Sequence, residues 1–460
     1  MYENKPPGVF LTWALVWALA DGSPVAGRLV GVLATCASGF LMGGLAQRVW
    51  GTKVGVLAGA LFVAAVCYWE YEFPFADTET FGILLSLGAL YVAWPRPERR
   101  TGPLCAALGG FLCGLALLWK QIFVIELLVV MAVVALQPVG FLRRVSLAAA
   151  ALGAAVVPLL ACLAYFHWHG LLPEFLDCTV AFLGQAGTLA EAGLVTRLAE
   201  SGVRLCLVFI GPMVLVLSVL GLCSIANLWR SPQRRVIIIC LVWTGAALLA
   251  ILVLGRASRH QFRQAVPALC LLAAGALGTH GRSRRTGLSA DAGSPTIAGC
   301  LVAFGMGISL VASALQIRGE VGRAFEAQMQ EPVTATRQEY ASPEEAVRAL
   351  TWPTDRIWCY PGGQVYANAR RLSASPYHTP ALLGRPGAQE QVLRALREGR
   401  AKLVVIDWVK VRDGRISRGF GRAHWPTFHR ALSEVLQEHF VLRATAGDSG
   451  IYEFTGGVTP

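Results

Sequence analysis

LCAALGGFLCGLALLWKQIFVIELLVVMAVVALQ, residues 104–137, holds two apolar runs that are separated by little more than Lys120 and Gln121. Each run approaches the roughly 20 residues that an α-helix needs to cross the roughly 30 Å hydrocarbon core of a membrane. A lysine between two such runs lies at or just under the membrane surface, where a charge is costly unless it has a partner. We therefore interpret 104–119 and 121–137 as consecutive spanning helices joined by a very short turn.

The composition of the whole chain agrees with this interpretation. Its 460 residues are 55% hydrophobic and 15% charged, whereas soluble proteins average about 25% charged residues. The chain is therefore predicted to be a mainly α, polytopic transmembrane protein. The ten predicted spanning helices are 25–46, 54–70, 78–94, 104–119, 121–137, 145–166, 204–228, 236–254, 262–279 and 296–316.

The basic residues predict the orientation of this helix bundle, because short cytoplasmic loops are enriched in Lys and Arg. Alternate loops carry such residues, whereas the loops between them include an acidic one. The Lys and Arg residues of the cytoplasmic loops account for most of the net charge of +12, so the charge does not indicate a nucleic-acid partner. With ten spans, both chain ends face outward. The basic loop residues are Arg48, Lys53, Arg96, Arg99, Arg100, Arg143, Arg144, Arg230, Arg234, Arg235, Arg282, Arg284 and Arg285.

The chain divides into three predicted regions: an outer juxtamembrane segment over 1–24, a helix bundle over 25–317, and a small extracytoplasmic α/β domain over 331–460. In the first, the apolar run 9–20 is too short to span and predicts a helix lying at the membrane surface. In the last, long apolar runs stop and charged residues recur. Its predicted helices are 342–350, 389–398 and 427–439, and its predicted strands are 356–360, 402–407, 440–444 and 451–454. Acceptor contact, a lid over a catalytic cavity, and structural packing are open roles for this domain.

The chain begins with Glu3-Asn4-Lys5-Pro6-Pro7. Two prolines prevent an immediate helix, so Lys5 and Glu3 stand in a rigid collar just before apolar sequence. There Lys5 is placed to meet a phosphate at the membrane surface. A solvated tail, or an anchoring lysine that reaches the interface, is the alternative.

Several short motifs follow one another along the chain, each on a predicted side of the membrane. The outward Lys-Pro-Pro collar is followed by Arg28 at the start of a spanning helix, by Gly51 after a basic turn, by Ala76-Asp77-Thr78-Glu79-Thr80-Phe81, and by Gly110-x-x-x-Gly114 leading to Lys120-Gln121. Over about residues 1–280, this series resembles the GT-C membrane glycosyltransferases. The branch it resembles includes protein O-mannosyltransferases, the lipid A aminoarabinose transferase and the rhizobial core-glycan transferases.

The resemblance implies a lipid-phosphate site and a carboxylate base. Lys5 matches the family lysine that holds the phosphate of a polyprenyl-phosphate-linked sugar. The family base, an Asp after the first helix, has no counterpart here, so either the natural protein is longer or this form is inactive. An outward N-terminus without a leader likewise predicts that a first helix is missing upstream of Met1, with translocation without a signal as the alternative. A vacant groove is then expected beside 25–46 and 78–94, lined by residues such as Gly31, Ala34, Gly82 and Leu85.

The remaining acids and cations complete the candidate site. Asp77 and Glu79 occupy the place of the second acidic residue of the family and are the predicted catalytic pair, although both suit ordinary helix capping. Lys120 is a predicted phosphate ligand whose alternative partners are Glu70 or Glu72. Arg256, Arg259 and His260 form an outward turn that opposes the usual charge bias and so suggests an anionic ligand.

The function predicted from these features is transfer of a sugar from a polyprenyl-phosphate donor to a lipid, glycan or protein acceptor on the outer face of the inner membrane. The alternative is a transporter or flippase of a lipid-linked or anionic substrate, which would share the apolar helices and the outward cations. Transporters usually carry an internal repeat, and the sequence has no convincing one. The sequence specifies no cofactor. A divalent metal held by Glu3 and His260 is one candidate, and a plain hydrogen bond of that histidine is the alternative.

Overall fold

The computed structural model describes residues 6–20, 24–69, 78–95, 101–177, 179, 212–229, 231, 233–254, 259–283, 338–360, 364–375, 377, 383, 387–412 and 425–456. These residues fall mainly into two compact units: a helix bundle within Lys5–Leu172 and Leu194–Glu320, and a C-terminal domain within Val321–Pro460. Each unit has its own hydrophobic core.

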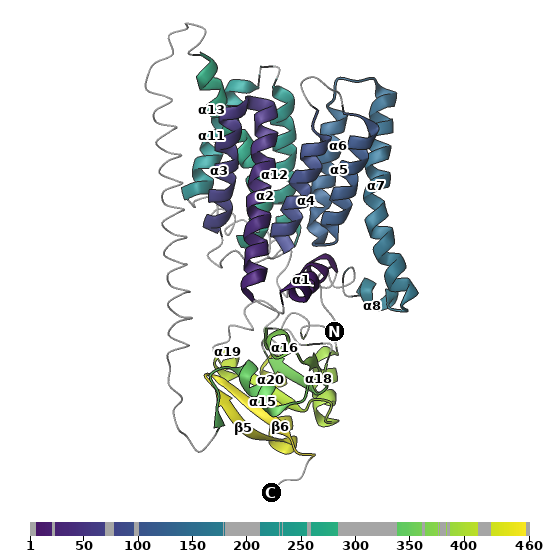
Figure 1. Ribbon diagram of the computed structural model, residues 1–460, viewed down its shortest axis with the longest axis vertical. Helices are drawn as coiled ribbons and strands as arrows, with labels where there is room; N and C mark the ends of the chain where they lie inside the picture. The colour runs from purple at the N-terminus through teal and green to yellow at the C-terminus, as the bar shows by residue number, and fades with distance from the viewer. Residues whose placement is uncertain are drawn as a thin grey trace. The chain divides into compact units, whose positions relative to one another are not determined.

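The bundle is built from the apolar runs seen in the sequence (Figure 1). Nine of the ten predicted spanning helices coincide with helices among the described residues, whereas 296–316 lies outside them. The helices of this unit are α1 (Gly8–Leu19), α2 (Pro24–Trp50), α3 (Thr52–Trp69), α4 (Thr78–Ala93), α5 (Pro103–Leu117), η1 (Gln121–Phe123), α6 (Val124–Ala135), α7 (Phe141–Trp168), α11 (Pro212–Leu228), α12 (Arg234–Leu254), η3 (Arg259–Ala265) and α13 (Val266–Ser283). The short α8 (Leu172–Leu176) follows α7.

Small residues bring α5 and α7 into backbone contact. A Cβ on Gly110 would overlap the carbonyl oxygen of Ala151, and a Cβ on Gly114 would overlap that of Ala155. Both helices thus place small residues four positions apart on the shared face, which is how apolar helices pack closely where the hydrophobic effect does not drive them together. The Gly110-x-x-x-Gly114 motif therefore has a structural role as a helix-packing surface.

The two predicted sets of loops lie at opposite ends of the bundle. Trp50, at the end of α2, lies against Gly275 in α13, whereas Arg263, just before α13, lies beside Thr80 at the start of α4. The basic turn that holds Arg48 is thus at one end, and the start of α4 is at the other. Which end faces the cytoplasm stays a prediction.

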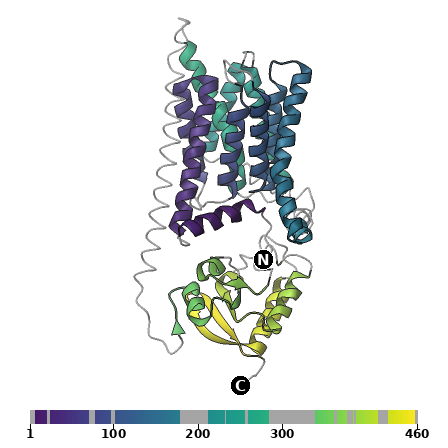
Figure 2. The ribbon, with the colours of Figure 1, turned by 45° about the vertical axis from the view of Figure 1, so that its right-hand side comes forward.

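Helix α1 crosses the end of the bundle where α4 begins (Figure 2). Its course agrees with the predicted helix over 9–20 that is too short to span. The expected vacant groove, in contrast, is not present at Gly82 or Ala34, two of the four residues named for it. The ring of Phe123 covers Gly82, and Ala34 packs with Phe81 in a small buried cluster. At Gly82 the groove prediction was wrong because η1 turns Phe123 inward onto this face.

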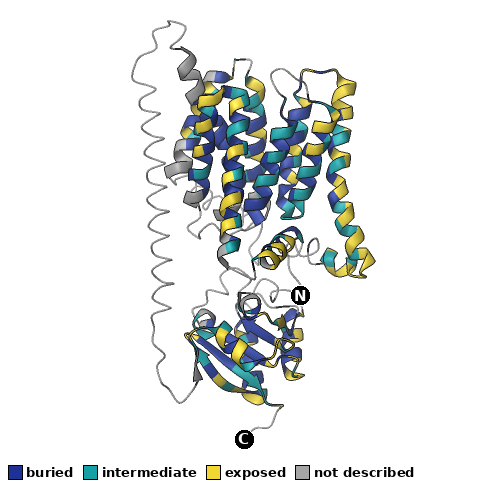
Figure 3. Cartoon of the chain, in the orientation of Figure 1, coloured by how far each residue is buried: buried dark blue, intermediate teal, exposed yellow. Residues whose placement is uncertain are grey.

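Figure 3 shows that α7 is exposed along much of its length. Only 28% of its most apolar window is buried, compared with 50% for α2. Leu142, Val157 and Leu160 are among the exposed side chains of α7, and such an apolar surface is unfavourable in water. Among the described residues, Leu29–Trp50 and Phe141–Trp168 are long and apolar enough to cross a membrane, and several shorter apolar helices, such as Thr78–Ala93 and Pro103–Leu117, accompany them.

The C-terminal domain is a six-stranded mixed sheet with helices. Its strand order is β1-β5-β6-β4-β2-β3, in which β6 pairs antiparallel with β5 and β4 and the other pairs are parallel. The strands are β1 (Gln338–Glu339), β2 (Arg356–Tyr360), β3 (Leu372–Ser373), β4 (Leu403–Asp407), β5 (Phe440–Ala446) and β6 (Ser449–Phe454). The helices are α15 (Pro343–Leu350), α16 (Gln364–Ala369), α18 (Ala388–Arg397), α19 (Trp408–Arg412) and α20 (Trp425–His439).

The predicted elements of this domain are confirmed. Ser342 caps α15 by accepting a hydrogen bond from the Glu345 amide at 3.2 Å, as the Ser-Pro-Glu-Glu pattern predicts. The sequence did not indicate α16, α19, β1 or β3, since these elements are only two to six residues long.

His429 is expected to make the stability of the C-terminal domain depend on pH. Its Nε2 lies 3.1 Å from the Tyr360 hydroxyl, and burial lowers the pKa of His429 below its ordinary value of 6.5. The unfolded chain then binds a proton at a higher pH than the folded domain does, so stability falls as pH decreases from about 6.5 toward the lowered pKa.

We expect His429→Gln to remove this part of the pH dependence. Calorimetric unfolding of the full-length chain between pH 8 and pH 5, with wild type and variant compared, measures the difference. Parallel curves for the two proteins would contradict the prediction.

Candidate functional site

The first turn of α4 carries three buried polar side chains. Thr78, Glu79 and Thr80 are 3%, 2% and 6% exposed. The Thr78 hydroxyl donates a hydrogen bond to Glu79 Oε2 at 2.6 Å. A carboxylate is favourable at a helix N-terminus because of the unpaired amides and the helix dipole there, although burying it is costly without a cation.

Lys120 supplies that cation. It follows α5 in an extended backbone conformation, and its ammonium forms an ion pair with Glu79 Oε1. The sequence suggested Glu70 or Glu72 as the protein partner of Lys120, whereas the structure shows Glu79. Since Glu79 is almost fully buried and the Lys120 side chain is 18% exposed, the pair lies at the edge of the bundle interior.

Arg263 in η3 adds a second cation. It is 3% exposed, and its Nη1 donates a hydrogen bond to the Thr80 hydroxyl at 3.4 Å. We call Thr78, Glu79, Thr80, Lys120 and Arg263 the polar cluster. Within the part of the chain that the structure describes, the cluster holds two cations and one carboxylate, a combination that suits an anionic ligand.

Gln264, the next residue in η3, is fully buried. Neither its amide oxygen nor its amide nitrogen has a hydrogen-bond partner in the described part of the chain. A buried amide in this state costs roughly 1–3 kcal/mol. The side-chain amide of Gln264, next to Arg263 in the sequence, can therefore still donate and accept hydrogen bonds.

Helix α1 is attached to the turn that holds Lys120. The Gly8 amide donates to the Leu118 carbonyl oxygen at 2.6 Å, and the Trp119 indole donates to the Thr12 hydroxyl at 3.2 Å. A Cβ on Gly8 would approach both Leu118 and Trp119 too closely. The backbone at the start of α1 is therefore hydrogen-bonded to Leu118, which is two positions before Lys120 in the sequence.

The other predicted site residues are not tested by these contacts. Glu3, Lys5, Asp77 and Arg256 lie outside the described residues. Arg259 and His260 fall in η3 together with Arg263, but their side chains are likewise outside the description. Their convergence with Lys5 on one cavity stays a prediction. In the ranges that the structure covers, no group of three or more His, Cys, Asp or Glu residues is arranged to hold a metal.

Sequence reasoning missed several residues with buried polar contacts. Thr78 and Thr80 were quoted only as part of the Ala76–Phe81 motif, and Arg263, in the same turn as Arg259 and His260, was not singled out. A second acid, Glu126, is 1% exposed in α6 and accepts a 3.4 Å hydrogen bond from the Trp243 indole. The signal for Glu126 was present, because it is the single acid within the run 121–137.

The described residues thus form a bundle of apolar helices with the polar cluster at one end, in a chain that also carries an α/β domain. No protein-family model matches the chain, and no curated protein matches its sequence. Solved structures, however, share its fold.

Two of these structures are of ArnT from Cupriavidus metallidurans. The structure bound to undecaprenyl phosphate matches with a TM-score of 0.64 and 15% identity, covering 100% of this chain and 90% of ArnT. The apo structure matches with a TM-score of 0.57 and 14% identity, covering 100% and 89%. The archaeal oligosaccharyltransferase AglB from Archaeoglobus fulgidus, in complex with an inhibitory peptide and a dolichol-phosphate, matches with a TM-score of 0.50 and 10% identity, covering 100% and 67%.

ArnT and AglB are GT-C glycosyltransferases, and the chain has the GT-C fold. The resemblance seen in the sequence is thereby confirmed at the level of fold. The match to ArnT extends over the whole chain and so includes the C-terminal domain, whereas the sequence motifs covered only about residues 1–280.

Proposed function

We propose that the chain is an integral-membrane glycosyltransferase that moves a sugar from a polyprenyl-phosphate-linked donor to a lipid, glycan or protein acceptor on the outer face of the inner membrane. The observation that carries this proposal is the buried polar cluster at one end of a bundle with the GT-C fold. ArnT, which shares that fold, has been crystallised with undecaprenyl phosphate.

A multi-pass membrane location is part of the proposal. The exposed apolar surface of α7 and the two helices that are long enough to span support it. In this arrangement the polar cluster lies at the outer end of the bundle, opposite the basic turn near Arg48, and the C-terminal domain is extracytoplasmic. The orientation follows from the positive-inside rule.

The cations are proposed to stabilise the departing lipid phosphate. Negative charge develops on that phosphate as the sugar leaves, and positioned cations in a water-poor site lower the free energy of the transition state. Lys120 and Arg263 are the described cations that the cluster brings together. Lys5, Arg256, Arg259 and His260 are proposed as further phosphate ligands.

Glu79 has a geometry that favours positioning Lys120 over acting as the catalytic base. Oε1 of Glu79 is paired with the Lys120 ammonium and Oε2 accepts a hydrogen bond from the Thr78 hydroxyl, so both carboxylate oxygens already have partners, whereas a general base must accept a proton from the acceptor hydroxyl. Asp77, the other predicted catalytic acid, therefore remains the proposed base within this sequence.

The proposal is tested by following a labelled sugar. Full-length protein in vesicles is given undecaprenyl-phosphate-linked sugars labelled in the sugar, together with a membrane extract as the source of acceptors. We expect undecaprenyl phosphate to be released while the label appears on another molecule. If the intact labelled donor crosses the bilayer with no cleavage, the transporter or flippase alternative holds and the transferase proposal is wrong.

A further inference from the structure

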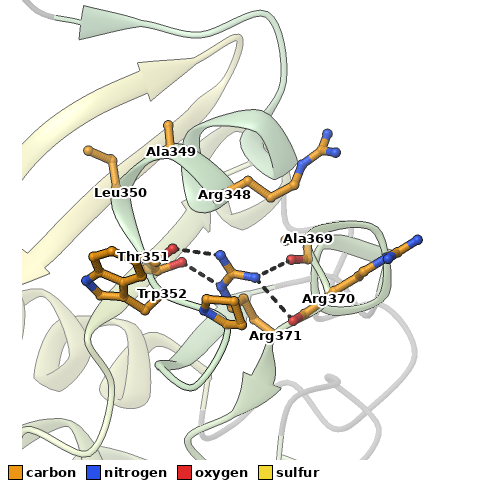
Figure 4. A pocket seen from close by; sticks show the side chains of 9 residues that line it. Arg348, Ala349, Leu350, Thr351, Trp352, Ala369, Arg370 and Arg371 are labelled. Carbon is orange, nitrogen blue, oxygen red and sulfur yellow. Dashed lines mark hydrogen bonds between the residues drawn. The ribbon is translucent and has the colours of Figure 1, made fainter.

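The arginines of this chain differ in what their side chains contact. In the C-terminal domain, Figure 4 shows Arg371 beside a pocket of about 530 Å³. Its guanidinium donates to the Thr351 carbonyl oxygen at 2.6 Å, to the Thr351 hydroxyl at 2.8 Å and to the Ala369 carbonyl oxygen at 2.9 Å, so its charge holds α15 and α16 together. In the first turn of α7, by contrast, Arg143 and Arg144 are exposed, and neither side chain has an ion pair within the described part of the chain.

The start of α7 lies beside the start of α5. Gly110 and Gly114 of α5 lie against Ala151 and Ala155 of α7 in the same order along both helices, so the two are parallel neighbours (Figure 1). The N-termini of both helices are therefore at the same end of the bundle.

This shared end is opposite the polar cluster. The Thr101 hydroxyl, just before α5, donates to the Ala93 carbonyl oxygen at 3.0 Å, at the end of the helix whose first turn holds Glu79. The Arg48 guanidinium donates to the Tyr91 carbonyl oxygen in the same part of α4. The start of α7 is therefore at the predicted cytoplasmic end, where the membrane leaflet carries anionic lipids.

Both α5 and α7 begin without a side-chain cap and without an acid. Their N-cap residues are Gly102 and Gly140, which have no side chain to accept a hydrogen bond, and neither first turn contains Asp or Glu. The first amides of an α-helix have no partner within the helix, and the helix dipole adds positive charge there. Two such ends side by side, with two arginines on one of them, form a region of positive potential.

Gln137, in the turn between α6 and α7, adds a buried donor at this end. Its side chain is in a residue that is 2% exposed, and its amide nitrogen has no hydrogen-bond partner in the part of the chain that the structure describes. A buried donor in this state is unfavourable. The partner that it lacks is an acceptor, which is what a phosphate oxygen provides.

The apolar surface of α7 indicates which kind of anion fits. Val145, Leu152 and Val156 are 49%, 44% and 44% exposed, and their spacing places them on one face of the helix, deeper in the bundle than the arginines. A soluble anion does not cover such a face, whereas the acyl chains of a lipid do. We propose that the shared end of α5 and α7 binds an anionic phospholipid of the cytoplasmic leaflet, with Arg143 and Arg144 on its phosphate and its acyl chains along α7. The proposal rests on the proposed membrane location and not on sugar transfer.

A lipid titration followed by native mass spectrometry tests this inference. Dioleoyl phosphatidylglycerol or dioleoyl phosphatidylcholine is added to the full-length chain in detergent, and the Kd of the first bound lipid is measured. We expect phosphatidylglycerol to bind tighter by about 10-fold or more, and a large excess of glycerol 3-phosphate to leave it bound. Equal binding of the two lipids would remove the anionic requirement, and displacement by glycerol 3-phosphate would make the ligand a soluble phosphate, so either result overturns the proposal.

Removing the arginines locates the site. Arg143→Gln combined with Arg144→Gln is expected to weaken phosphatidylglycerol binding by about 10-fold or more and to leave phosphatidylcholine binding unchanged. Arg234→Gln combined with Arg235→Gln removes the same charge from the exposed first turn of α12 and is the matched control, which should bind as the wild type does. An equal loss in both double variants would indicate general charge attraction, and wild-type affinity in the α7 variant would exclude its arginines. Each of these outcomes contradicts the proposal.

A change of N-cap tests the helix end itself. A Cβ on Gly140 would meet nothing within 4 Å, so this position accepts a side chain. Gly140→Asp caps α7 and adds a negative charge, so it is expected to weaken phosphatidylglycerol binding by about 10-fold or more without lowering the melting temperature. Gly140→Asn supplies a similar cap without the charge and should keep the wild-type affinity. If the two variants bound the lipid equally, the start of α7 would not hold the anion.

The outcome is separable from that of the proposed sugar transfer. No turnover is measured, so failure of donor cleavage leaves the lipid result standing. Loss of phosphatidylglycerol binding in the wild type likewise leaves donor cleavage at the polar cluster, at the other end of the bundle, as a separate question. Failure to bind either lipid would contradict the membrane location on which the site rests.

Discussion

Lys120→Ala is expected to reduce the rate of sugar transfer by about 10²–10³-fold, the usual loss when one preorganised charge-stabilising group is removed from a transition state. Lys120 is the partly exposed cation of the polar cluster, and Glu79 holds its ammonium in place. The loss should fall mainly on kcat, because the charge on the phosphate grows as the sugar departs. Release of undecaprenyl phosphate under saturating donor measures it.

The pairing with Glu79 supplies the controls for this prediction. Lys120→Arg keeps the charge and should retain part of the activity. Glu79→Ala should also reduce the rate, but in a Lys120→Ala background it should have little further effect, because a positioning carboxylate acts through the lysine. A strong additional loss in the double variant would show that Glu79 is the catalytic base after all. Unchanged turnover in Lys120→Ala would reduce this lysine to a membrane-surface anchor.

Gly110→Ala is expected to destabilise the helix bundle by about 3–5 kcal/mol, the range of severe single-residue defects. The added methyl group would meet the Ala151 carbonyl oxygen, which belongs to rigid helix backbone and cannot rotate away. The α5 and α7 helices must then separate along their whole contact, and Gly114→Ala should have the same effect against Ala155. Thermal unfolding of the detergent-solubilised chain, followed by size-exclusion chromatography, measures the loss.

Gly153 provides the matched control, since it lies on α7 and a Cβ there would meet nothing within 4 Å. Gly153→Ala should stabilise the helix by about 0.5–1 kcal/mol, because alanine loses less backbone entropy than glycine on folding. If Gly110→Ala and Gly153→Ala behaved alike, close packing of α5 on α7 would not be what stabilises the bundle.

The sequence predicted the fold well where the signal is local. The apolar runs set the positions of the bundle helices, and the Ser342 cap with the amphipathic pattern of 389–398 set those of the C-terminal domain. Two-residue strands such as β1 and β3 could not be predicted, because their existence depends on a neighbouring strand. The groove expected at Gly82 failed for a similar reason: the residue that fills it, Phe123, comes from another turn of the chain.

The candidate site was only partly predictable. Glu79 and Lys120 were each singled out, one as a catalytic acid and the other as a phosphate ligand, but 41 positions separate them and no pattern within a single helix connects them. Arg263 was hidden among neighbouring arginines, since charge alone does not tell which of them turns inward to Thr80. What the sequence lacks in each case is the packing of α4 against the α5–η1 turn and η3, which exists only in the folded bundle.

The attachment of α1 to the end of α5 sets an order on the synthesis of this chain. Thr12 and Trp119 are 107 positions apart, so at about 5–20 residues per second the ribosome delivers the partner of α1 roughly 5–20 s after α1 itself. During that interval α1 can already pack on α2, where Trp13 lies against Gly27, and its exposed Leu11, Leu15 and Leu19 favour the lipid surface. When α5 is complete, Leu118 receives the Gly8 amide and Lys120 meets Glu79. The residues that hold α1 and the lysine that pairs with Glu79 therefore become available at the same stage of synthesis.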